Sequence, residues 1–226
     1  VHDALIHPHL VLAINPLAKK IFVGKRNDKH SVSQDTIHTL LVEESRKGNK
    51  VVRLKGGDPF IFGRGGEEVM LLAKEGIAFE VIPGVTAGIG AAAAFGIPLT
   101  YRDQATSTLF ITGHQCRATD LQDWKTLAKL DATLVFYMGM KRIKGIVNGL
   151  THSGKPKTTP IAIVQNATMV NQAILISTLG HIITDVEKIT SRTPSVIIIG
   201  DVVNHAANLK ECLDAIPSKM VESIDY

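Results

Sequence analysis

The chain has 226 residues, enough for one large or two small α/β domains with a buried core. Hydrophobic residues make up 45% and charged residues 20%, which is ordinary for a globular protein. The net charge is +4 and no run of basic residues stands out, so we predict no nucleic-acid partner, whereas an anionic small molecule is compatible.

Neither the cysteines nor the apolar stretches indicate a metal site or a membrane span. Cys116 and Cys212 lack paired metal-type spacing, which favours a reducing, cytoplasmic compartment and no thiol catalysis. The histidines are scattered, so no metal site is predicted. The segment 81–101 is uncharged, but Pro83, Pro98 and several glycines interrupt it. It is typical of a strand, a turn and a small-residue helix, and we predict no membrane partner.

The first half of the chain alternates strands and helices, as a parallel α/β architecture requires. The expected strands are Ile21–Lys25, Val51–Leu54 and Phe79–Ile82. The expected helices are one capped by Ser33 and stopped by Gly48, one from about Glu67 to Glu75, and Thr86–Phe95.

Residues 96–103 are the predicted linker between an N-terminal domain over 1–98 and a C-terminal domain over 104–226. The expected strands of the second half are Thr108–Thr112, Thr133–Met138, Ile161–Gln165, Ala173–Ser177 and Val196–Ile199. The expected helices are Leu121–Leu130, Ile143–Thr151, Thr178–Ile189 and Asn204–Leu213. Because two consecutive strands near 161–177 have no helix between them, we expect a mixed sheet there.

The most informative stretch is VVRLKGGDPFIFGRGGEE at residues 51–68. Gly56 and Gly57 lack a Cβ and adopt positive φ at little cost, so a flat ligand can lie against their backbone. Asp58 adds an acceptor, and Ile61 offers an apolar wall. The stretch lacks the Gly-Lys-Ser/Thr ending of a P-loop and the spacing of a dinucleotide-binding loop. It therefore favours a neutral or cationic adenosine-type ligand, with an ordinary glycine-rich connection as the alternative.

Three segments carry a resemblance to a known family: KGGDPFIFGRGGEE, VIPGVTAGIGAAAAFGIPLTYRD and STLFITGH. They closely resemble the uroporphyrinogen-III C-methyltransferases of the tetrapyrrole methylase family, and the likeness extends from Asp3 to about Val203. The resemblance implies two α/β domains with a cofactor cleft between them, and a homodimer. It also implies S-adenosyl-L-methionine as cofactor, S-adenosyl-L-homocysteine as product, and two methyl transfers to uroporphyrinogen III. The product would be precorrin-2, for sirohaem or cobalamin.

Methyl transfer from a sulfonium to carbon needs positioning, one base and one acid, but no metal. By the resemblance, Asp3 matches the family's proposed proton acceptor and Lys25 its proposed donor. From the residues alone, both are equally compatible with solvated surface charges. Relatives usually have Tyr-Asp-Arg where this chain has His-Asp-Ala at 2–4, so one cation for a substrate carboxylate is missing. Arg64 and Arg26, together with Lys25, could bind the eight substrate carboxylates instead.

The resemblance also assigns the cofactor contacts. In the first domain they are Gly56, Gly57, Asp58, Ile61, Thr86 and Ala87. In the second domain they are Met138, in FYMG, and Ala167, in QNAT. Family members often carry glycine at the position of Ala167, so this chain adds one methyl group there. A methionine such as Met138 is, on its own, more typical of a core than of a ligand site.

Relatives carry an earlier strand and a glycine- and proline-rich loop that this sequence lacks. Either the chain is truncated or the true start lies outside the sequence given. A parallel sheet without that strand exposes an unpaired edge, so we expect lower stability. Two alternatives stay open: a methyltransferase acting on a later precorrin, and a non-catalytic nucleotide-binding module. The missing strand and Ala4 keep the second alternative open, whereas residues 51–68 favour uroporphyrinogen III as substrate.

Overall fold

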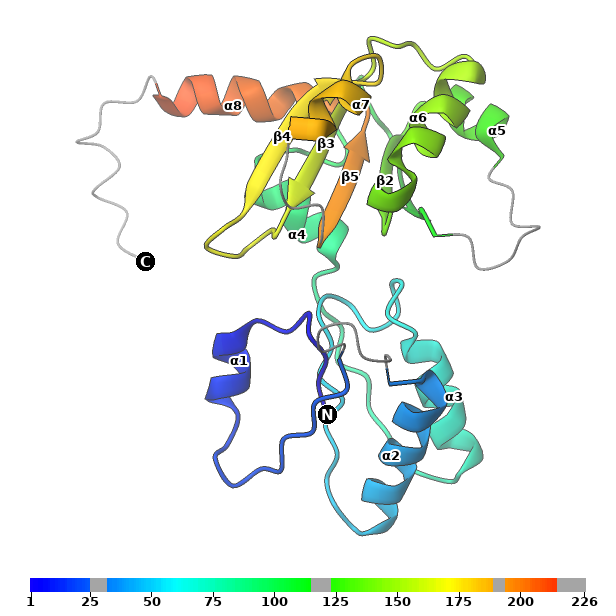
Figure 1. The fold of residues 1–226 in the computed structure, drawn as a ribbon, viewed down its shortest axis with the longest axis vertical. Helices are drawn as coiled ribbons and strands as arrows, with labels where there is room; N and C mark the ends of the chain where they lie inside the picture. The colour runs from blue at the N-terminus through cyan, green and yellow to red at the C-terminus, as the bar shows by residue number, and fades with distance from the viewer. Residues whose placement is uncertain (25–31, 115–122, 189–193, 215–226) are drawn as a thin grey trace. The chain divides into compact units, whose positions relative to one another are not determined.

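The computed structural model describes residues 1–24, 32–114, 123–188 and 194–214. The chain forms two compact units, Val1–Ala87 and Gly88–Tyr226 (Figure 1). The division falls before the predicted linker, so helix α4 (Ala87–Ala94) lies almost wholly in the second unit. The linker itself stays a prediction. Three residues singled out from the sequence, Lys25, Arg26 and Cys116, lie outside the described residues.

The second unit is built on a five-stranded mixed sheet with the order β1-β2-β5-β3-β4 (Figure 1). Its strands are β1 (Thr108–Thr112), β2 (Thr133–Tyr137), β3 (Pro160–Gln165), β4 (Ala173–Thr178) and β5 (Ser195–Ile199). Strands β1 and β2 are parallel, while β5 runs antiparallel to both β2 and β3, and β4 runs antiparallel to β3. The predicted strands of this half and its mixed sheet are therefore confirmed, with ends that differ by at most one residue.

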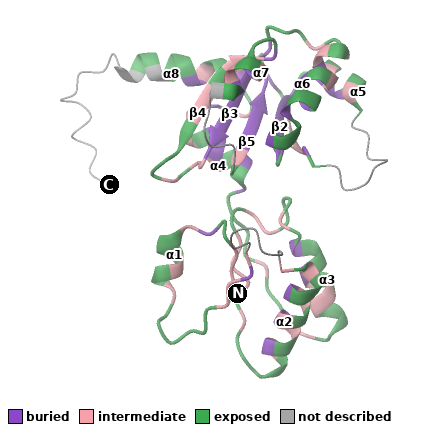
Figure 2. Ribbon diagram, viewed as in Figure 1, coloured by how far each residue is buried: buried purple, intermediate pink, exposed green. Residues whose placement is uncertain are grey.

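Helices cover both faces of this sheet. The second unit contains α5 (Trp124–Lys129), η1 (Met140–Arg142), α6 (Ile143–His152), α7 (Ile182–Asp185), η2 (Val186–Lys188), η3 (Asp201–Val203) and α8 (Asn204–Asp214). Strands β2 and β3 are buried at every position, as the purple core of Figure 2 shows. Such continuous burial explains why their sequences are unbroken apolar runs rather than alternating ones.

Successive residues of β2 enter two different apolar clusters because side chains alternate across a strand. Leu134 and Phe136 pack with residues of α5, α6 and α7, whereas Val135 and Tyr137 pack with residues of α4, η3 and α8. The first cluster includes a close contact between α5 and α6: a Cβ at Gly149 would overlap the indole of Trp124. The predicted helix over 178–189 is wrong at its start, because Thr178 completes β4 and α7 begins at Ile182.

The first unit contains α1 (Pro8–Ala13), α2 (Gln34–Arg46) and α3 (Gly65–Lys74). Its predicted strands are wrong: within residues 1–24 and 32–87 only isolated bridges form. His2 bridges Phe22 on one side and Leu54 on the other, both in parallel. The His2 amide donates to the Ile21 carbonyl at 2.9 Å. Because the three segments meet at a single residue, they do not extend into ladders.

The remaining sequence predictions for the first unit concern its helices and the segment 77–86. Helix α1 was missed because its cap is a histidine: the His7 side chain accepts from the His9 amide at 3.2 Å. The predicted cap of α2 is confirmed, since Ser33 Oγ accepts from the Thr36 amide at 3.1 Å. Residues 77–86 form no helix or strand. No helix among the described residues has the length and apolar character needed to cross a membrane.

The buried carboxylate of Glu44, in α2, forms an ion pair with Lys19 in the preceding segment of the chain. Glu44 is 6% exposed and accepts hydrogen bonds from Lys19 Nζ at 2.9 Å, Lys47 Nζ at 3.0 Å and Asn49 Nδ2 at 2.9 Å. The hydrogen bonds from the two lysines lower the pKa of Glu44 to about 2. Glu44 is therefore ionised throughout the neutral and mildly acidic range.

Acid should weaken the protein through Glu44. The folded pKa of about 2 lies below the unfolded value of about 4.3, so the stabilisation is complete above about pH 5 and disappears as the pH falls toward 2. Glu44→Gln should thus be less stable than the wild type at pH 6, and the difference should shrink at pH 3. Urea denaturation over this pH range measures it. A difference in unfolding free energy that does not change with pH would contradict this account.

Candidate functional site

The glycine loop, residues 55–66, lies backbone against backbone with the segment 84–87. Gly57 has φ +77°, which side-chain-bearing residues rarely adopt, and a Cβ on it would lie 3.4 Å from the Ala87 amide nitrogen. A Cβ on Gly84 would overlap the Gly57 carbonyl oxygen. Gly57 thus has the positive φ that the sequence allows at this glycine pair, whereas the close approach of the two segments requires glycine at 84.

Asp58 joins the same two segments by hydrogen bonds. Its Oδ2 accepts from the Gly84 amide at 3.1 Å, and its Oδ1 accepts from the Phe60 amide at 2.8 Å. These backbone hydrogen bonds lower the pKa of Asp58, with the one from Gly84 as the largest cause. Both carboxylate oxygens thus bind main chain, and Asp58 stabilises the loop.

The loop and the segment 84–87 expose main chain and apolar side chains. Gly56, Gly57 and Ala87 are exposed, and Ile61 is 36% exposed. Thr86 is the exception among the predicted contacts of the first unit, because it is only 5% exposed. Main-chain polar groups beside an apolar side chain are among the groups that contact ligands in binding sites, so this surface is compatible with an adenosine-type ligand.

Arg64, at the end of the loop, forms an ion pair with its own helix. It has φ +58°, and its Nε donates to Glu67 Oε1 at 2.8 Å while a second nitrogen donates to Glu67 Oε2. Both side chains are about half exposed. The hydrogen bond to Glu67 raises the pKa of Arg64 and lowers the pKa of Glu67. The predicted substrate-binding cation is thus paired with Glu67.

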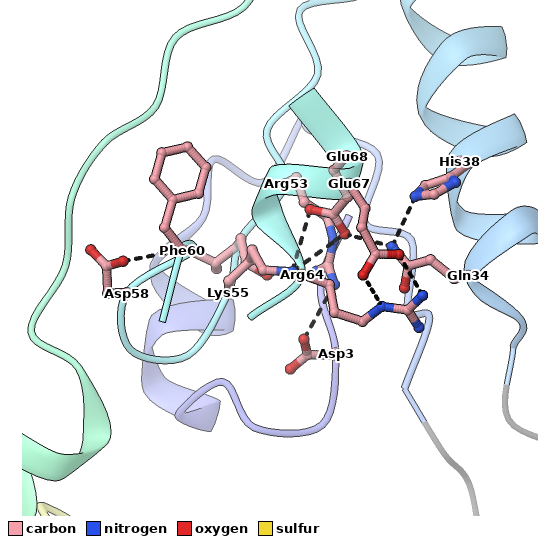
Figure 3. Close-up of polar contacts among 11 residues, drawn as sticks. Asp3, Gln34, His38, Arg53, Lys55, Asp58, Phe60, Arg64, Glu67 and Glu68 are labelled. Atoms are coloured by element: carbon pink, nitrogen blue, oxygen red, sulfur yellow. Dashed lines mark hydrogen bonds and ion pairs between the residues drawn. The ribbon is translucent and has the colours of Figure 1, made fainter. Parts of the chain in front are cut away.

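Asp3, the predicted proton acceptor, accepts hydrogen bonds from two donors rather than lying free in solvent, and Figure 3 shows the one from Arg53. Its Oδ1 accepts from the Leu5 amide at 3.0 Å, and its Oδ2 accepts from Arg53 Nη2 at 3.4 Å. The same guanidinium donates through Nη1 to the Leu54 carbonyl at 2.9 Å. The Asp3 side chain is 26% exposed.

A buried charge cluster is connected to Asp3 through Arg53, and it was not predicted from the sequence. Glu68, in the first turn of α3, accepts from Arg53 Nε at 3.3 Å, from Lys55 Nζ at 3.3 Å and from Gln34 Nε2 at 3.2 Å (Figure 3). Burial is the main cause that lowers the pKa of Lys55, and the Arg53 charge lowers it further. One signal was available: Arg53 and Lys55 are two residues apart on an extended segment, which places them on one face.

In the second unit, the predicted residues Met138 and Ala167 follow two strands that end at the same edge of the sheet. Both β2 and β3 run antiparallel to β5, which lies between them. At the start of β5, Val196 pairs with the last residue of β2, and Ser195 pairs with the last residue of β3. The structure therefore brings together two residues that were singled out separately.

The backbone at this sheet edge is strained. Met138, Asn166 and Thr168 have φ values of +55°, +46° and +66°, which non-glycine residues adopt at a cost. Met138 is 55% exposed, so it is not core filler. Nearby, a Cβ on Gly113 would overlap the Gly139 backbone, a close approach that the sequence analysis missed. Strained residues at the carboxyl ends of strands are typical of ligand sites in α/β proteins.

The fold is that of an α/β protein, and each unit offers a candidate ligand-binding region: the glycine loop in the first unit and the strand ends in the second. The chain belongs to the tetrapyrrole (corrin/porphyrin) methylases, whose family model matches residues 3–183. It is 35% identical to uroporphyrin-III C-methyltransferase from Thermus thermophilus complexed with S-adenosyl homocysteine, with a TM-score of 0.74 over 90% of this chain and 85% of that one. A cobalt precorrin-4 methyltransferase, 23% identical, shares the fold with a TM-score of 0.78 over 89% of this chain and 83% of that one.

Longer relatives are also similar. The chain is 46% identical to a siroheme synthase of Actinobacillus pleuropneumoniae serotype 7 (strain AP76) over 203 residues, which are 90% of this chain and 41% of that protein. It is 47% identical to siroheme synthase 2 of Yersinia pestis (strain Pestoides F) over 205 residues, 90% of this chain and 43% of that protein. The chain thus spans less than half the length of these two relatives.

Proposed function

We propose that this chain is an S-adenosyl-L-methionine-dependent C-methyltransferase that methylates uroporphyrinogen III twice to give precorrin-2, for sirohaem or cobalamin. The proposal rests on one observation: the exposed glycine-loop backbone lies against the segment 84–87. The chain that contains it is 35% identical to a uroporphyrin-III methyltransferase. We also propose that the enzyme is a cytoplasmic homodimer, which light scattering and cell fractionation would test.

The residues present fit the cofactor. Gly56, Gly57 and Ala87 offer exposed backbone, and Met138 and Ala167 follow strands at one sheet edge. Ile61 would contact the adenosine portion through its exposed apolar side chain. Asp58 and Thr86 would act by shaping the loop, since Asp58 binds two backbone amides and Thr86 is buried. When bound, the cofactor supplies an electrophilic methyl group.

The chain's own ionisable residues would move protons and bind the substrate. We propose that Asp3 accepts the proton that leaves the macrocycle, with its carboxylate oriented by the Leu5 amide and by Arg53. Lys25 would return a proton. Arg64 and Arg26 would bind substrate carboxylates, and Arg64 would exchange its exposed partner Glu67 for one of them.

The direct test is methyl transfer from isotope-labelled S-adenosyl-L-methionine to uroporphyrinogen III by the chain. Two labelled methyl groups per product molecule are expected. Incorporation into a later precorrin with none into uroporphyrinogen III would assign a different substrate. Binding of S-adenosyl-L-homocysteine without transfer to any tetrapyrrole would instead make the chain a non-catalytic module, and the proposal would be wrong.

Gly57→Ala should weaken binding of S-adenosyl-L-homocysteine about tenfold, because Gly57 is exposed and the added methyl group would overlap a cofactor that lies against its backbone, at a cost of about 1–3 kcal/mol. Isothermal titration calorimetry measures the affinity. Gly48→Ala is the matched control: Gly48 has φ +79°, but a Cβ there meets nothing within 4 Å. Both variants acquire the same backbone strain, so equal affinities would show that Gly57 does not face the cofactor.

A further inference from the structure

The buried cluster around Glu68 connects directly to the predicted proton acceptor. Seen from Asp3 in Figure 3, Glu68 lies on the far side of the Arg53 guanidinium. We propose that Glu68 is a positioning residue for methyl transfer, and that it orients the Asp3 carboxylate by holding Arg53. The inference rests on the proposed role of Asp3 as proton acceptor.

The geometry of Arg53 carries this inference. A guanidinium is planar, so its donors keep fixed directions relative to one another. Nε donates to Glu68 Oε1 at 3.3 Å, Nη1 donates to the Leu54 carbonyl at 2.9 Å, and Nη2 donates to Asp3 Oδ2 at 3.4 Å. The first two hydrogen bonds set the plane of the group. The direction of the third donor, Nη2, toward the Asp3 carboxylate is then fixed.

Charge makes Glu68 the key member of the cluster. Its side chain is 6% exposed, while those of Arg53 and Lys55 are 14% and 11% exposed. Removal of the Glu68 charge would leave two buried cations side by side without the carboxylate that both bind. A neutral glutamine oxygen attracts them less, and repulsion from Lys55 would move Arg53 away from its present position.

Helices α2 and α3 both support the arrangement. Glu68 belongs to the first turn of α3, where the helix dipole favours a carboxylate. Gln34 Nε2 donates to Glu68 Oε1 at 3.2 Å from the first turn of α2, and its amide also contacts His38 Nε2 at 3.1 Å. The Glu68 carboxylate is thus attached to two helices, so it forms a rigid anchor for the Arg53 side chain.

The test separates positioning from stability by a double-mutant cycle in the full chain with Asp3→Asn, Glu68→Gln and both together. Glu68→Gln should lower kcat for methyl transfer to uroporphyrinogen III about tenfold and change S-adenosyl-L-homocysteine affinity less than twofold. In the Asp3→Asn background the same substitution should change kcat less than twofold. Glu68→Asp, which keeps the charge, should recover part of the lost kcat. Labelled cofactor makes the residual turnover measurable.

Glu44→Gln is the matched control. Glu44 is also a buried carboxylate that binds two cations in the first unit, but neither of them contacts Asp3. Its substitution should lower the melting temperature, as Glu68→Gln should, without lowering kcat at a temperature where both variants are folded. If Glu68→Gln does not fold, Glu68→Asp takes its place in the cycle.

Two outcomes would overturn the inference, and they differ from failure of the proposed function. If Glu68→Gln lowers kcat by the same factor with and without Asp3, Glu68 acts independently of Asp3. If Glu68→Gln and Glu44→Gln lose stability alike and both keep full kcat, Glu68 is only structural. Full activity of Asp3→Asn would instead contradict the proposed role of Asp3 and would remove the basis of the inference.

Discussion

Replacement of Asp3 by asparagine is expected to lower kcat for methylation of uroporphyrinogen III by about 10²- to 10⁴-fold, the range that a positioned general base contributes. Asparagine keeps the size of the side chain, and its single oxygen can still accept from the Leu5 amide, but its NH2 group replaces the oxygen that binds Arg53 and it cannot take up a proton. The fold and the affinity for S-adenosyl-L-homocysteine should therefore change little. Steady-state kinetics with labelled cofactor measure kcat and KM separately.

Asp35→Asn is a suitable control for this substitution. Asp35 is an exposed carboxylate in the first turn of α2, and its loss should cost only a few tenths of a kcal/mol of helix stability. Its kcat should equal that of the wild type. A kcat for Asp3→Asn within threefold of the wild type would show that another group accepts the proton.

Arg64→Ala should lower kcat/KM for uroporphyrinogen III roughly ten- to a hundredfold, since a charge-assisted contact to a carboxylate contributes about 1.5–3 kcal/mol. The protein itself should lose little stability, because the Arg64–Glu67 pair is about half exposed and such pairs contribute only a few tenths of a kcal/mol. Affinity for S-adenosyl-L-homocysteine should stay the same. The loss should also shrink at high salt, where the wild type itself binds the substrate more weakly.

Arg46→Ala is the control for Arg64→Ala. Arg46 is likewise exposed and is paired with a glutamate, Glu75, in the same unit. It should reproduce any general effect of a lost surface arginine without a change in kcat/KM. If both variants turn over uroporphyrinogen III as the wild type does, Arg64 only stabilises α3 through its ion pair with Glu67, and the proposed substrate contact is wrong.

The two halves of the chain differ in how far the sequence predicted them. In the second unit, strands such as Ile161–Gln165 are buried on both faces, and a continuous apolar run bounded by turn residues predicts them well. In the first unit, Val51 and Val52 have the same β-branched character, yet Val52 is 63% exposed and the segment forms only a single bridge at Leu54. The β-propensity of a segment does not predict how many of its residues form hydrogen-bonded pairs with a neighbouring segment.

The candidate site was predictable where backbone conformation determined the residue. Gly57 needs positive φ, and a glycine pair after an extended segment indicates this directly. The spacing of Arg53 and Lys55 indicates that they share a face, but their contacts with Glu68 were not predictable, because they join residues 13 and 15 positions apart in the sequence. Met138 was predicted from the resemblance alone, since a methionine residue does not by itself indicate a left-handed backbone. Proton-acceptor and substrate-binding roles stay predictions.

The packing of Trp124 against Gly149 gives the protein a built-in optical reporter. Trp124 is the single tryptophan of the sequence, and it lies in the second unit. Its emission therefore follows loosening of α5 from α6, whereas far-ultraviolet circular dichroism follows helices of both units. A comparison of the two signals during one thermal scan would show whether the units lose structure together. The same comparison, repeated with S-adenosyl-L-homocysteine, would reveal which unit the ligand protects without any added label.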